Sequence, residues 1–541
     1  MADNNLIMLT ENMARSRLFF IINFIIVLLL LIPRLDGFDY FPGKYLLAED
    51  GVTFLNEAQT LGASAIFNPY NGYLHFYPRV IAYISSNFSM IYRPLITLGG
   101  WVISYLWLVY VISKAVQSIN FGLFSSVALI SLVALQPNYG ENFFNLTNAQ
   151  WMLGAILVIF ALVDAEVMPE QKIVKLILLI LLGLTGPFSI IIAPVILVNA
   201  FIKKDWKSNF LVYFVIFSCA IVQLLVLIGT GRATTGEINK SPFDWLFSLF
   251  QLLMFNASTV AVLCAAIFFW LLIFYSFIGQ SSRTGYDRKK LLLPFMLVIT
   301  AILFIFFSQY AHKQDPLGIA TPGGGNRYTW IPYILIFFAA LIVSMEMRIV
   351  HLAIILSALF ICIQNFHGIK SPNLQFSSFA RYSKFQEVVI PINPQWPVYP
   401  GWHIKGIPNA GSNEINIVSV DIFPESVFAS GATVYFEDDV LYLNSMGNQP
   451  ILILKKPILC KGGNDLAVEI YMTRDSEGWM RLLWSGTGNF READSLRRWY
   501  PAGFVKAQFA FPNSGNGTYL LFNPMEVAGT TKINKIVGYC F

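Results

Sequence analysis

The sequence predicts a mostly α-helical polytopic membrane protein with an all-β domain in its C-terminal part. Three observations indicate this class. Of the 541 residues, 56% are hydrophobic and only 12% are charged, whereas about a quarter of the residues in soluble domains are charged. Apolar stretches of about 20 residues, long enough to cross a ~30 Å hydrocarbon core, recur along the first two thirds of the chain. From about residue 366, short alternating stretches bounded by turn residues replace them.

We expect about eleven membrane-spanning helices. The segment 172–202 is open to two interpretations, because Gly183, Gly186 and Pro187 are typical of either a tight reversal or one broken helix. The first span has too long an apolar core for a cleavable signal peptide, so we expect it to be retained. The expected spans are 18–35, 95–113, 119–136, 149–164, 172–185, 187–202, 209–229, 249–278, 291–310, 328–346 and 349–365.

The positions of lysine and arginine predict the orientation, because positively charged short loops stay in the cytoplasm. An N-terminus inside the cell places 13 of these residues in inner loops and 8 in outer loops, although the outer loops are roughly twice as long in total. An odd number of spans then places the C-terminal part outside. The net charge of +5 reflects this bias and does not indicate nucleic-acid binding. The inner residues are Arg15, Arg17, Lys114, Lys172, Lys175, Lys203, Lys204, Lys207, Arg283, Arg288, Lys289, Lys290 and Arg348; the outer ones are Arg34, Lys44, Arg79, Arg93, Arg232, Lys240, Lys313 and Arg327.

Two of the five cysteines predict a disulfide. Cys219, Cys264 and Cys362 lie in expected spans, where inert packing is their expected role. Cys460 and Cys540 share the outer domain, and an oxidising compartment would let them close a loop of about 80 residues.

The C-terminal third is expected to be a β-sandwich over 400–541, preceded by a linker over 366–399 that contains several prolines. Strands are predicted from alternation and from bounding Gly, Asn and Asp residues. They are 427–430, 432–436, 440–443, 451–454, 466–472, 479–484 and 519–522.

The first outer loop, 36–94, is too long for a simple connector. An amphipathic helix is expected over 52–61, and the adjacent acids Glu49 and Asp50 precede it. Apolar neighbours place Asp50 near the membrane surface, where partial desolvation would raise its pKa and improve it as a base. The alternative is that one of the two acids caps the helix, because Asp is a preferred N-cap residue.

Other outer loops contain compact polar clusters. The second outer loop has several amides, a carboxylate and Trp151, a combination that suits sugar hydroxyls, although amides and aromatic residues are also common at membrane boundaries. A glycine run at 323–325 precedes Arg327 and Tyr328; it is either a flexible loop or a phosphate site. His75, alone in an aromatic stretch, is more typical of packing. No spacing of metal ligands is present.

These clusters together resemble the GT-C class of polytopic glycosyltransferases. Within that class, the chain is similar over about residues 1–365 to the serotype-converting O-antigen glucosyltransferases of enteric bacteria and their phages. The resemblance rests on the order of five motifs along the chain and on their expected location on the outer side of the membrane. They are Ala48-Glu49-Asp50-Gly51, Gly72-Tyr73-Leu74-His75 with Pro78-Arg79, Asn145-Leu146-Thr147-Asn148 with Gln150-Trp151, Thr185-Gly186-Pro187-Phe188, and Arg327-Tyr328.

The resemblance implies an enzyme of the bacterial inner membrane with its β domain in the periplasm. It would transfer a sugar, glucose by the resemblance, from an undecaprenyl-phosphate-linked donor to O-antigen repeat units of lipopolysaccharide. No cofactor or metal is implied, and a donor flippase and a donor synthase are the implied partners. Asp50 or Glu49 would be the base. Arg327, Arg79, Arg232 and Tyr328 would bind the donor phosphate, and Tyr73, His75, Asn145, Asn148, Gln150 and Trp151 would contact sugar or acceptor.

Three alternatives stay open at this stage. A transporter or flippase would place ionisable residues near the bilayer midplane, and the expected spans contain almost none. A non-catalytic polysaccharide-binding or assembly protein is the second alternative. An O-antigen polymerase, which also acts on lipid-linked glycans outside the cell, is the third. For the β domain, Trp479, Trp484, Trp499 and Tyr500 are possible sugar-stacking residues, with core packing as the alternative for each.

Overall fold

A computed structural model of the chain divides into two compact units, and each is described by itself. Unit 1 comprises 1–36, 63–81 and 98–370, and unit 2 comprises 37–62, 82–97 and 371–541. The structure describes residues 18–35, 44–119, 121–137, 142–163, 171–204, 206–231, 241–282, 291–312, 317–320, 326–366, 372–394, 401–408, 416–420, 426–445, 450–460, 465–513, 517–526 and 528–541.

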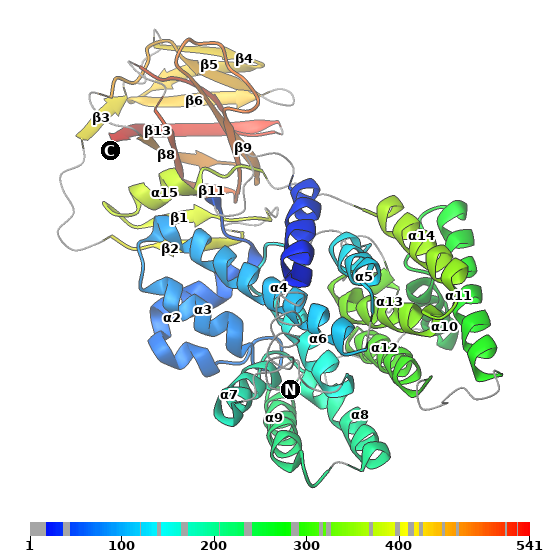
Figure 1. Cartoon of the computed structure of the whole chain (residues 1–541). Coiled ribbons are helices and arrows are strands. Elements are labelled where there is room, and N and C mark those ends of the chain that lie inside the picture. The colour runs from blue at the N-terminus through cyan, green and yellow to red at the C-terminus, as the bar shows by residue number, and fades with distance from the viewer. Residues whose placement is uncertain are drawn as a thin grey trace. The chain divides into compact units, whose positions relative to one another are not determined.

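The N-terminal two thirds of the chain is mostly helical (Figure 1). Five helical stretches in the described residues are long and apolar enough to cross a membrane. They are Met90–Ser118, Phe210–Gly229, Val260–Ser281, Leu292–Ala311 and Arg327–Ser344, and they contain helices α4 (Arg93–Ser118), α9 (Phe210–Gly229), α11 (Val260–Ser281), α12 (Leu292–Ala311) and α13 (Trp330–Ser344).

The remaining helices of unit 1 are shorter, so the expected count of about eleven spans is not established. They are Leu18–Arg34, α5 (Leu123–Leu135), α6 (Ala149–Leu162), α7 (Lys172–Gly183), α8 (Phe188–Lys203), α10 (Pro242–Leu253) and α14 (Arg348–Gln364). In the segment 172–202 the chain forms two helices, α7 and α8, and not one broken helix.

One expected span is wrong: 249–278 is not a single helix. Helix α10 begins at a capping box formed by Ser241 and Asp244. It ends before Phe255 and Asn256, whose φ angles of 57° and 52° lie in the left-handed region that a helix cannot contain. The membrane-length helix here is α11, which begins at Val260.

Helix α13 forms the centre of unit 1. Fourteen of its fifteen residues are buried, and it packs against α5, α6, α11, α12 and α14. Helices α9 and α11 are just as apolar, yet most of their residues are exposed at least in part. An apolar surface of this kind is suited to contact with lipid.

The C-terminal part of unit 2 contains two antiparallel sheets that face each other (Figure 1). Trp484 of the first sheet stacks on Phe511 of the second at 4.6 Å between ring centroids. The first sheet has the order β10 (Ser495–Tyr500), β9 (Gly478–Ser485), β12 (Tyr519–Asn523), β7 (Ile451–Leu454), β4 (Val427–Ser430). The second has the order β11 (Gly503–Pro512), β8 (Asp465–Arg474), β13 (Gly529–Cys540), β6 (Val440–Ser445), β5 (Ala432–Glu437), and β3 (Asn416–Val420) also pairs with β13.

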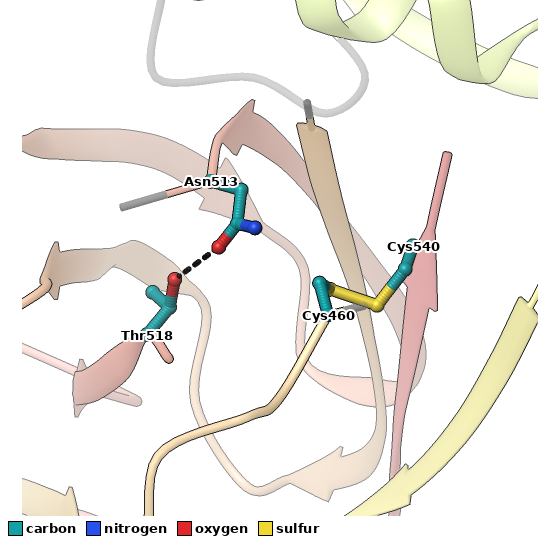
Figure 2. Close-up of a disulfide and its surroundings, with 4 residues drawn as sticks. All are labelled: Cys460, Asn513, Thr518 and Cys540. Atoms are coloured by element: carbon teal, nitrogen blue, oxygen red, sulfur yellow. Dashed lines mark hydrogen bonds between the residues drawn. A yellow bond between two sulfur atoms is a disulfide. The ribbon is translucent and has the colours of Figure 1, made fainter. Parts of the chain in front are cut away.

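All seven predicted strands are present, with shifts of at most two residues at their ends. The disulfide between Cys460 and Cys540, predicted above, is also present, with Cα atoms 5.5 Å apart. Figure 2 shows that it attaches the segment after β7 to the end of β13, near the hydrogen bond that Thr518 donates to Asn513. Of the other cysteines, Cys219 and Cys362 are buried and Cys264 is exposed.

The stretch 366–399, expected to be a linker, contains helix α15 (Phe376–Tyr382) and strand β1 (Val388–Pro391), which pairs with β2 (His403–Gly406). Two buried carboxylates of β8 hold α15 on the second sheet. Asp465 accepts hydrogen bonds from Ser378 at 2.8 Å and Arg381 at 3.0 Å, and Glu469 accepts one from Tyr382 at 3.1 Å. These contacts make the described residues 372–394 an integral part of unit 2.

Candidate functional site

The acidic pair Glu49 and Asp50 lies on a helix of unit 2 that contains an unusual turn. Residues Asp50–Leu55 form a π-helix, which continues directly into α2 (Asn56–Leu61). The expected amphipathic helix over 52–61 therefore begins earlier than predicted. Asp50 is buried, with 2% of its surface exposed, whereas Glu49 is half-buried. Turns of this type are frequent at functional sites.

The capping alternative for the two acids is not supported. Glu49 occupies the position before the π-helix, but its side chain makes no capping hydrogen bond. Asp50 lies inside the helix, where a side chain cannot serve as its N-cap. Helix capping therefore does not explain why two carboxylates stand here.

The segment that presents the acids is fixed by the β1–β2 ribbon. The Ala48 amide donates to the Asn393 carbonyl at 2.5 Å, and the Asn393 amide donates to the Leu46 carbonyl at 3.3 Å. Further along the same helix, the Asn56 side chain donates to the His403 carbonyl at 3.3 Å. A Cβ added at Gly51 would lie 2.5 Å from Ile392. A larger residue here would have to displace the end of the Ile392 side chain, so glycine lets the helix pack this closely beside Asp50.

In unit 1, two other predicted motifs are joined through their backbones. His75 and Thr185 form an antiparallel bridge, the Gly186 amide donates to the Leu74 carbonyl at 2.9 Å, and the Tyr77 amide donates to the Thr185 hydroxyl at 3.1 Å. Residues 74–77 and the α7–α8 reversal are thus held together by these hydrogen bonds.

Sequence analysis missed the residue that completes this junction. Gln223 lies inside the apolar helix α9 and is fully buried. Its amide accepts a hydrogen bond from the Leu74 amide at 2.9 Å and donates to the carbonyls of Leu74 and Gly186 at 3.2 Å and 3.0 Å. The sequence did contain a signal for this residue, because Gln223 is a single amide within an apolar span. Polar side chains in such spans form hydrogen bonds with neighbouring helices or backbone groups.

The amide and indole of the second outer loop lie against the same junction. A Cβ added at Gly186 would lie 2.9 Å from the Gln150 side-chain oxygen. Trp151 packs edge-on against Phe188 at 5.0 Å and against Tyr328 at 5.2 Å. Parts of four predicted motifs, those around His75, Gln150, Gly186 and Tyr328, therefore meet in unit 1.

Several polar atoms in this region are buried without a hydrogen-bond partner. Among the described residues they include the side-chain oxygen of Gln150 and the indole nitrogens of Trp151 and Trp330. Asn142 and Gln136, next to the same loop, each have both amide atoms unsatisfied. Buried polar groups almost always have partners, so unsatisfied atoms in a cluster indicate a place for water or a polar ligand.

The remaining phosphate candidates differ in their surroundings. Arg327 is partly exposed, and its guanidinium lies 5.3 Å from the Tyr328 ring centroid, with His312 on another side of that ring at 4.5 Å. Arg79 is 1% exposed and donates to the Ala65 carbonyl at 3.0 Å. Arg232 lies outside the described residues, as do the glycines at 323–325 and the loop carboxylate Glu141.

The other sugar-contact candidates are largely occupied by structural contacts. The His75 ring is buried and stacks on Tyr73 at 4.6 Å. Asn145 accepts a hydrogen bond from the backbone of Asn148 at 3.4 Å, and both residues are buried. Among the described sugar-contact candidates, Gln150 and Trp151 each have a buried polar atom without a hydrogen-bond partner.

Arg34 is a second buried cation of unit 1 that sequence analysis did not select. It donates to the carbonyls of Ala134 and Gln136 at 3.1 Å and 2.8 Å and lies 4.1 Å from the Phe143 ring centroid. Arg34 is completely buried. In the described part of the chain no group of three His, Cys, Asp or Glu residues could hold a metal ion.

No family model and no curated protein matches the chain. Solved structures that are similar to part of it include the apo form of BiXyn10A CBM1, at 12% identity, 24% of this chain, 99% of that chain and a TM-score of 0.20. They also include a family 29 carbohydrate-binding module, at 9% identity, 24% and 90% coverage and a TM-score of 0.19. The C-terminal CBM6 of LamC, a marine laminarinase from Zobellia galactanivorans, has 10% identity, 23% and 100% coverage and a TM-score of 0.19. At such TM-scores we draw nothing about this chain from these similarities.

Proposed function

We propose that the protein is a polytopic glycosyltransferase of the GT-C type that modifies O-antigen outside the bacterial inner membrane. It uses an undecaprenyl-phosphate-linked sugar, glucose by the resemblance, as donor and an O-antigen repeat unit as acceptor. The observation that supports this proposal most is the cluster of buried polar atoms without partners at Gln150 and Trp151, because an amide and an indole beside aromatic rings suit a sugar.

The proposed reaction is a single displacement. A carboxylate, for which we select Asp50, takes the proton of the acceptor hydroxyl, and the hydroxyl oxygen then attacks the anomeric carbon of the donor sugar. The bond between that carbon and the lipid phosphate breaks, and the phosphate leaves with the bonding electrons. Arg327 stabilises the charge that develops on the phosphate. With the β-linked donors that the resemblance implies, the product is α-linked by inversion.

Three features of Asp50 support its selection over Glu49. Its side chain is buried, whereas that of Glu49 is half-buried. It is the first residue of a π-helix, and Gly51 beside it packs in close contact with Ile392. A rigid and desolvated carboxylate is the better general base, because its orientation is set in advance. Glu49 is then a supporting residue.

The experiment is sugar and linkage analysis of O-antigen from cells with and without the gene. We expect the gene to add a side-branch hexose, and we expect Asp50→Asn to remove it. Glu49→Gln should lower the modified fraction less, and Glu57→Gln, a carboxylate two turns further along the same helix, should leave it unchanged. Protein amounts in the membrane must match.

The same analysis distinguishes the alternatives. A change in chain length with the sugar composition unchanged would identify a polymerase and contradict the proposed transfer. If neither changes, the protein is neither enzyme. Full modification by the Asp50→Asn variant would exclude Asp50 as the base.

A further inference from the structure

The outward face of the second sheet in unit 2 has a row of side chains that crosses five strands. Tyr435 of β5 lies opposite Tyr442 of β6, which lies opposite Lys532 of β13. Lys532 lies opposite Thr473 of β8, which lies opposite Phe504 of β11. Because neighbouring strands are ~4.8 Å apart, the row is about 19 Å long.

Two of the three aromatic residues of this row are exposed, and the third, Tyr442, is half-buried. Tyr435 is 45% exposed and Phe504 is 67% exposed. The rings of Tyr435 and Tyr442 are parallel within 9°, with centroids 4.7 Å apart, and the Lys532 ammonium lies 5.2 Å from the Tyr442 centroid. Strand alternation directs neighbours such as Leu441 into the core. The exposed aromatic face is therefore a regular consequence of the strand pattern.

Both hydrogen-bond donors and hydrogen-bond acceptors border the rings. Thr433, Thr473 and Lys532 are exposed donors along the row. The two-residue turn between β5 and β6 consists of Asp438 and Asp439, which are exposed and adopt positive φ angles of 50° and 61°. Donors and carboxylate acceptors thus flank one aromatic platform.

This combination has the chemistry of a sugar-binding surface. A sugar ring has a face of C–H groups that can stack on an aromatic ring, and a rim of hydroxyls that both donate and accept hydrogen bonds. An anionic membrane surface is a poorer fit, because the carboxylates of the β5–β6 turn would repel it. A protein partner would need a larger apolar centre than separated rings provide.

We propose that this face, formed by Tyr435, Tyr442, Lys532, Thr473 and Phe504, binds a polysaccharide chain that lies along the row. The identity of that chain as the acceptor of the transferase rests on the proposed function, whereas the binding itself does not.

The outward face of the first sheet offers a matched comparison. Trp479 and Trp499 are direct cross-strand partners there. The Arg497 guanidinium lies over the Trp479 ring at 4.6 Å and pairs with Glu526 at 2.5 Å. An ion-paired guanidinium therefore already covers that ring, so Trp479→Ala is a suitable control for loss of an aromatic side chain.

The test measures binding of the full-length protein in lipid nanodiscs to immobilised, lipid-free O-polysaccharide from the strain that carries the gene. We expect the double variant Tyr435→Ala, Tyr442→Ala to raise the Kd about tenfold or more, because it loses two stacking contacts with the polysaccharide. Phe504→Ser, at the other end of the row, should weaken binding by about threefold or more. Tyr435→Phe and Trp479→Ala should stay within about twofold of wild type.

Unfolding temperatures identify any variant that fails to fold, and Phe504→Ser then serves in its place. Unchanged binding by folded variants of the row would overturn the proposal, as would loss of binding in Trp479→Ala alone. If the folded variants of the row lose binding to phosphatidylglycerol vesicles but still bind the polysaccharide, the proposal is also overturned, and the face is then assigned to the membrane. If wild type binds through the row yet transfers no sugar, only the proposed function fails.

Discussion

Glu469 is a buried carboxylate whose oxygens accept from six side chains. The donors are Tyr382, Gln386, Tyr471, Lys506, Gln508 and Tyr539. Burial alone would raise the pKa of Glu469, but the hydrogen bonds from Lys506 and its neighbours lower it to about 2. The charge therefore stabilises the attachment of α15 to the second sheet.

This arrangement predicts a specific pH dependence of stability. The folded-state pKa of about 2 is below the ordinary value of 4.5, so the carboxylate stabilises the fold above pH 4.5. This contribution, on the order of 3 kcal/mol, is lost as the pH falls from 4.5 towards 2. Glu469→Gln should lower the free energy of unfolding of unit 2 at neutral pH and flatten its pH dependence in that window.

Denaturant titration of the full-length protein in nanodiscs, followed by tryptophan fluorescence between pH 2 and 7, measures both effects. Glu477→Gln, an exposed acid in the turn after β8, is the matched control and should behave as wild type. A Glu469→Gln variant with the wild-type pH slope would disprove this role.

Trp151 allows packing and hydrogen bonding to be separated. Trp151→Phe keeps an aromatic ring between Phe188 and Tyr328 but removes the unpaired indole N–H. If that N–H binds the sugar, kcat/KM for transfer should fall about tenfold or more, because a site built to donate a hydrogen bond loses it. The measurement is transfer in membranes with a synthetic lipid-linked donor.

A wild-type rate in Trp151→Phe would show that the indole N–H is not used. The control is Trp330→Phe, which also removes a buried indole N–H without a partner. Its ring lies against Tyr105 and Phe143, and we expect a smaller loss of activity.

At the scale of elements, close packing of helices depends on glycine. Gly154 of α6 faces Phe188 of α8, and an added Cβ would lie 2.6 Å from the ring. Gly154→Ala should therefore destabilise the protein by about 1 to 3 kcal/mol through overpacking. Gly99 of α4 has nothing within 4 Å of an added Cβ, so Gly99→Ala should be neutral or stabilising by up to about 1 kcal/mol.

Thermal unfolding in matched detergent compares the two alanine variants directly. Because both substitutions have the same chemistry inside a helix, only the neighbouring ring distinguishes them. Equal unfolding temperatures for the two variants would mean that α6 and α8 do not pack as described.

Several elements could not be predicted from local patterns. Strand β11 was missed because Lys506 and Gln508 interrupt its apolar run, yet both side chains reach Glu469 on β8. Strand β13 was missed because Lys532 and Lys535 break its alternation. Strands β4 to β9 are short, mostly apolar stretches between turn residues, and they were predicted correctly.

The candidate site shows the same limit. Individual motifs could be selected because amides, aromatic residues and Gly-Pro turns stand out in an apolar chain. Their junction could not be predicted, because it is made by Gln223, whose backbone partner Leu74 lies 149 residues earlier in sequence. The periodicity of helices and strands relates only residues that are close in sequence, so it cannot pair two residues at that separation.

At the scale of the whole chain, the side of the membrane on which the C-terminal domain lies depends on the number of membrane crossings. With the N-terminus inside the cell, an odd number places that domain outside. Helix α7 has 12 residues and is about 18 Å long, too short to cross a ~30 Å core alone. Because a reversal joins α7 to α8, either both helices cross the membrane or neither does. In both cases the chain returns to the side from which it started, so an odd number of membrane crossings stays odd. With α10 counted as an interfacial helix, α11 replaces the expected span 249–278 one for one.

We therefore expect alkaline phosphatase fused after Phe541 to be active, because that enzyme folds only outside the cytoplasm. Fusion after Glu346, between α13 and α14, should be inactive. Activity at both points, or only at Glu346, would contradict an N-terminus inside the cell. Fusion-protein amounts measured by immunoblotting exclude differences in expression.

The central position of β13 has a consequence for the order of events during synthesis. This strand is made after every other strand of its sheet, yet it lies between β8 and β6. Until the ribosome has made it, the β11–β8 and β6–β5 pairs each have an edge open to other chains. The nascent domain must therefore wait, partly assembled, until β13 has been made. A chaperone that covers open strand edges would be most useful in that interval.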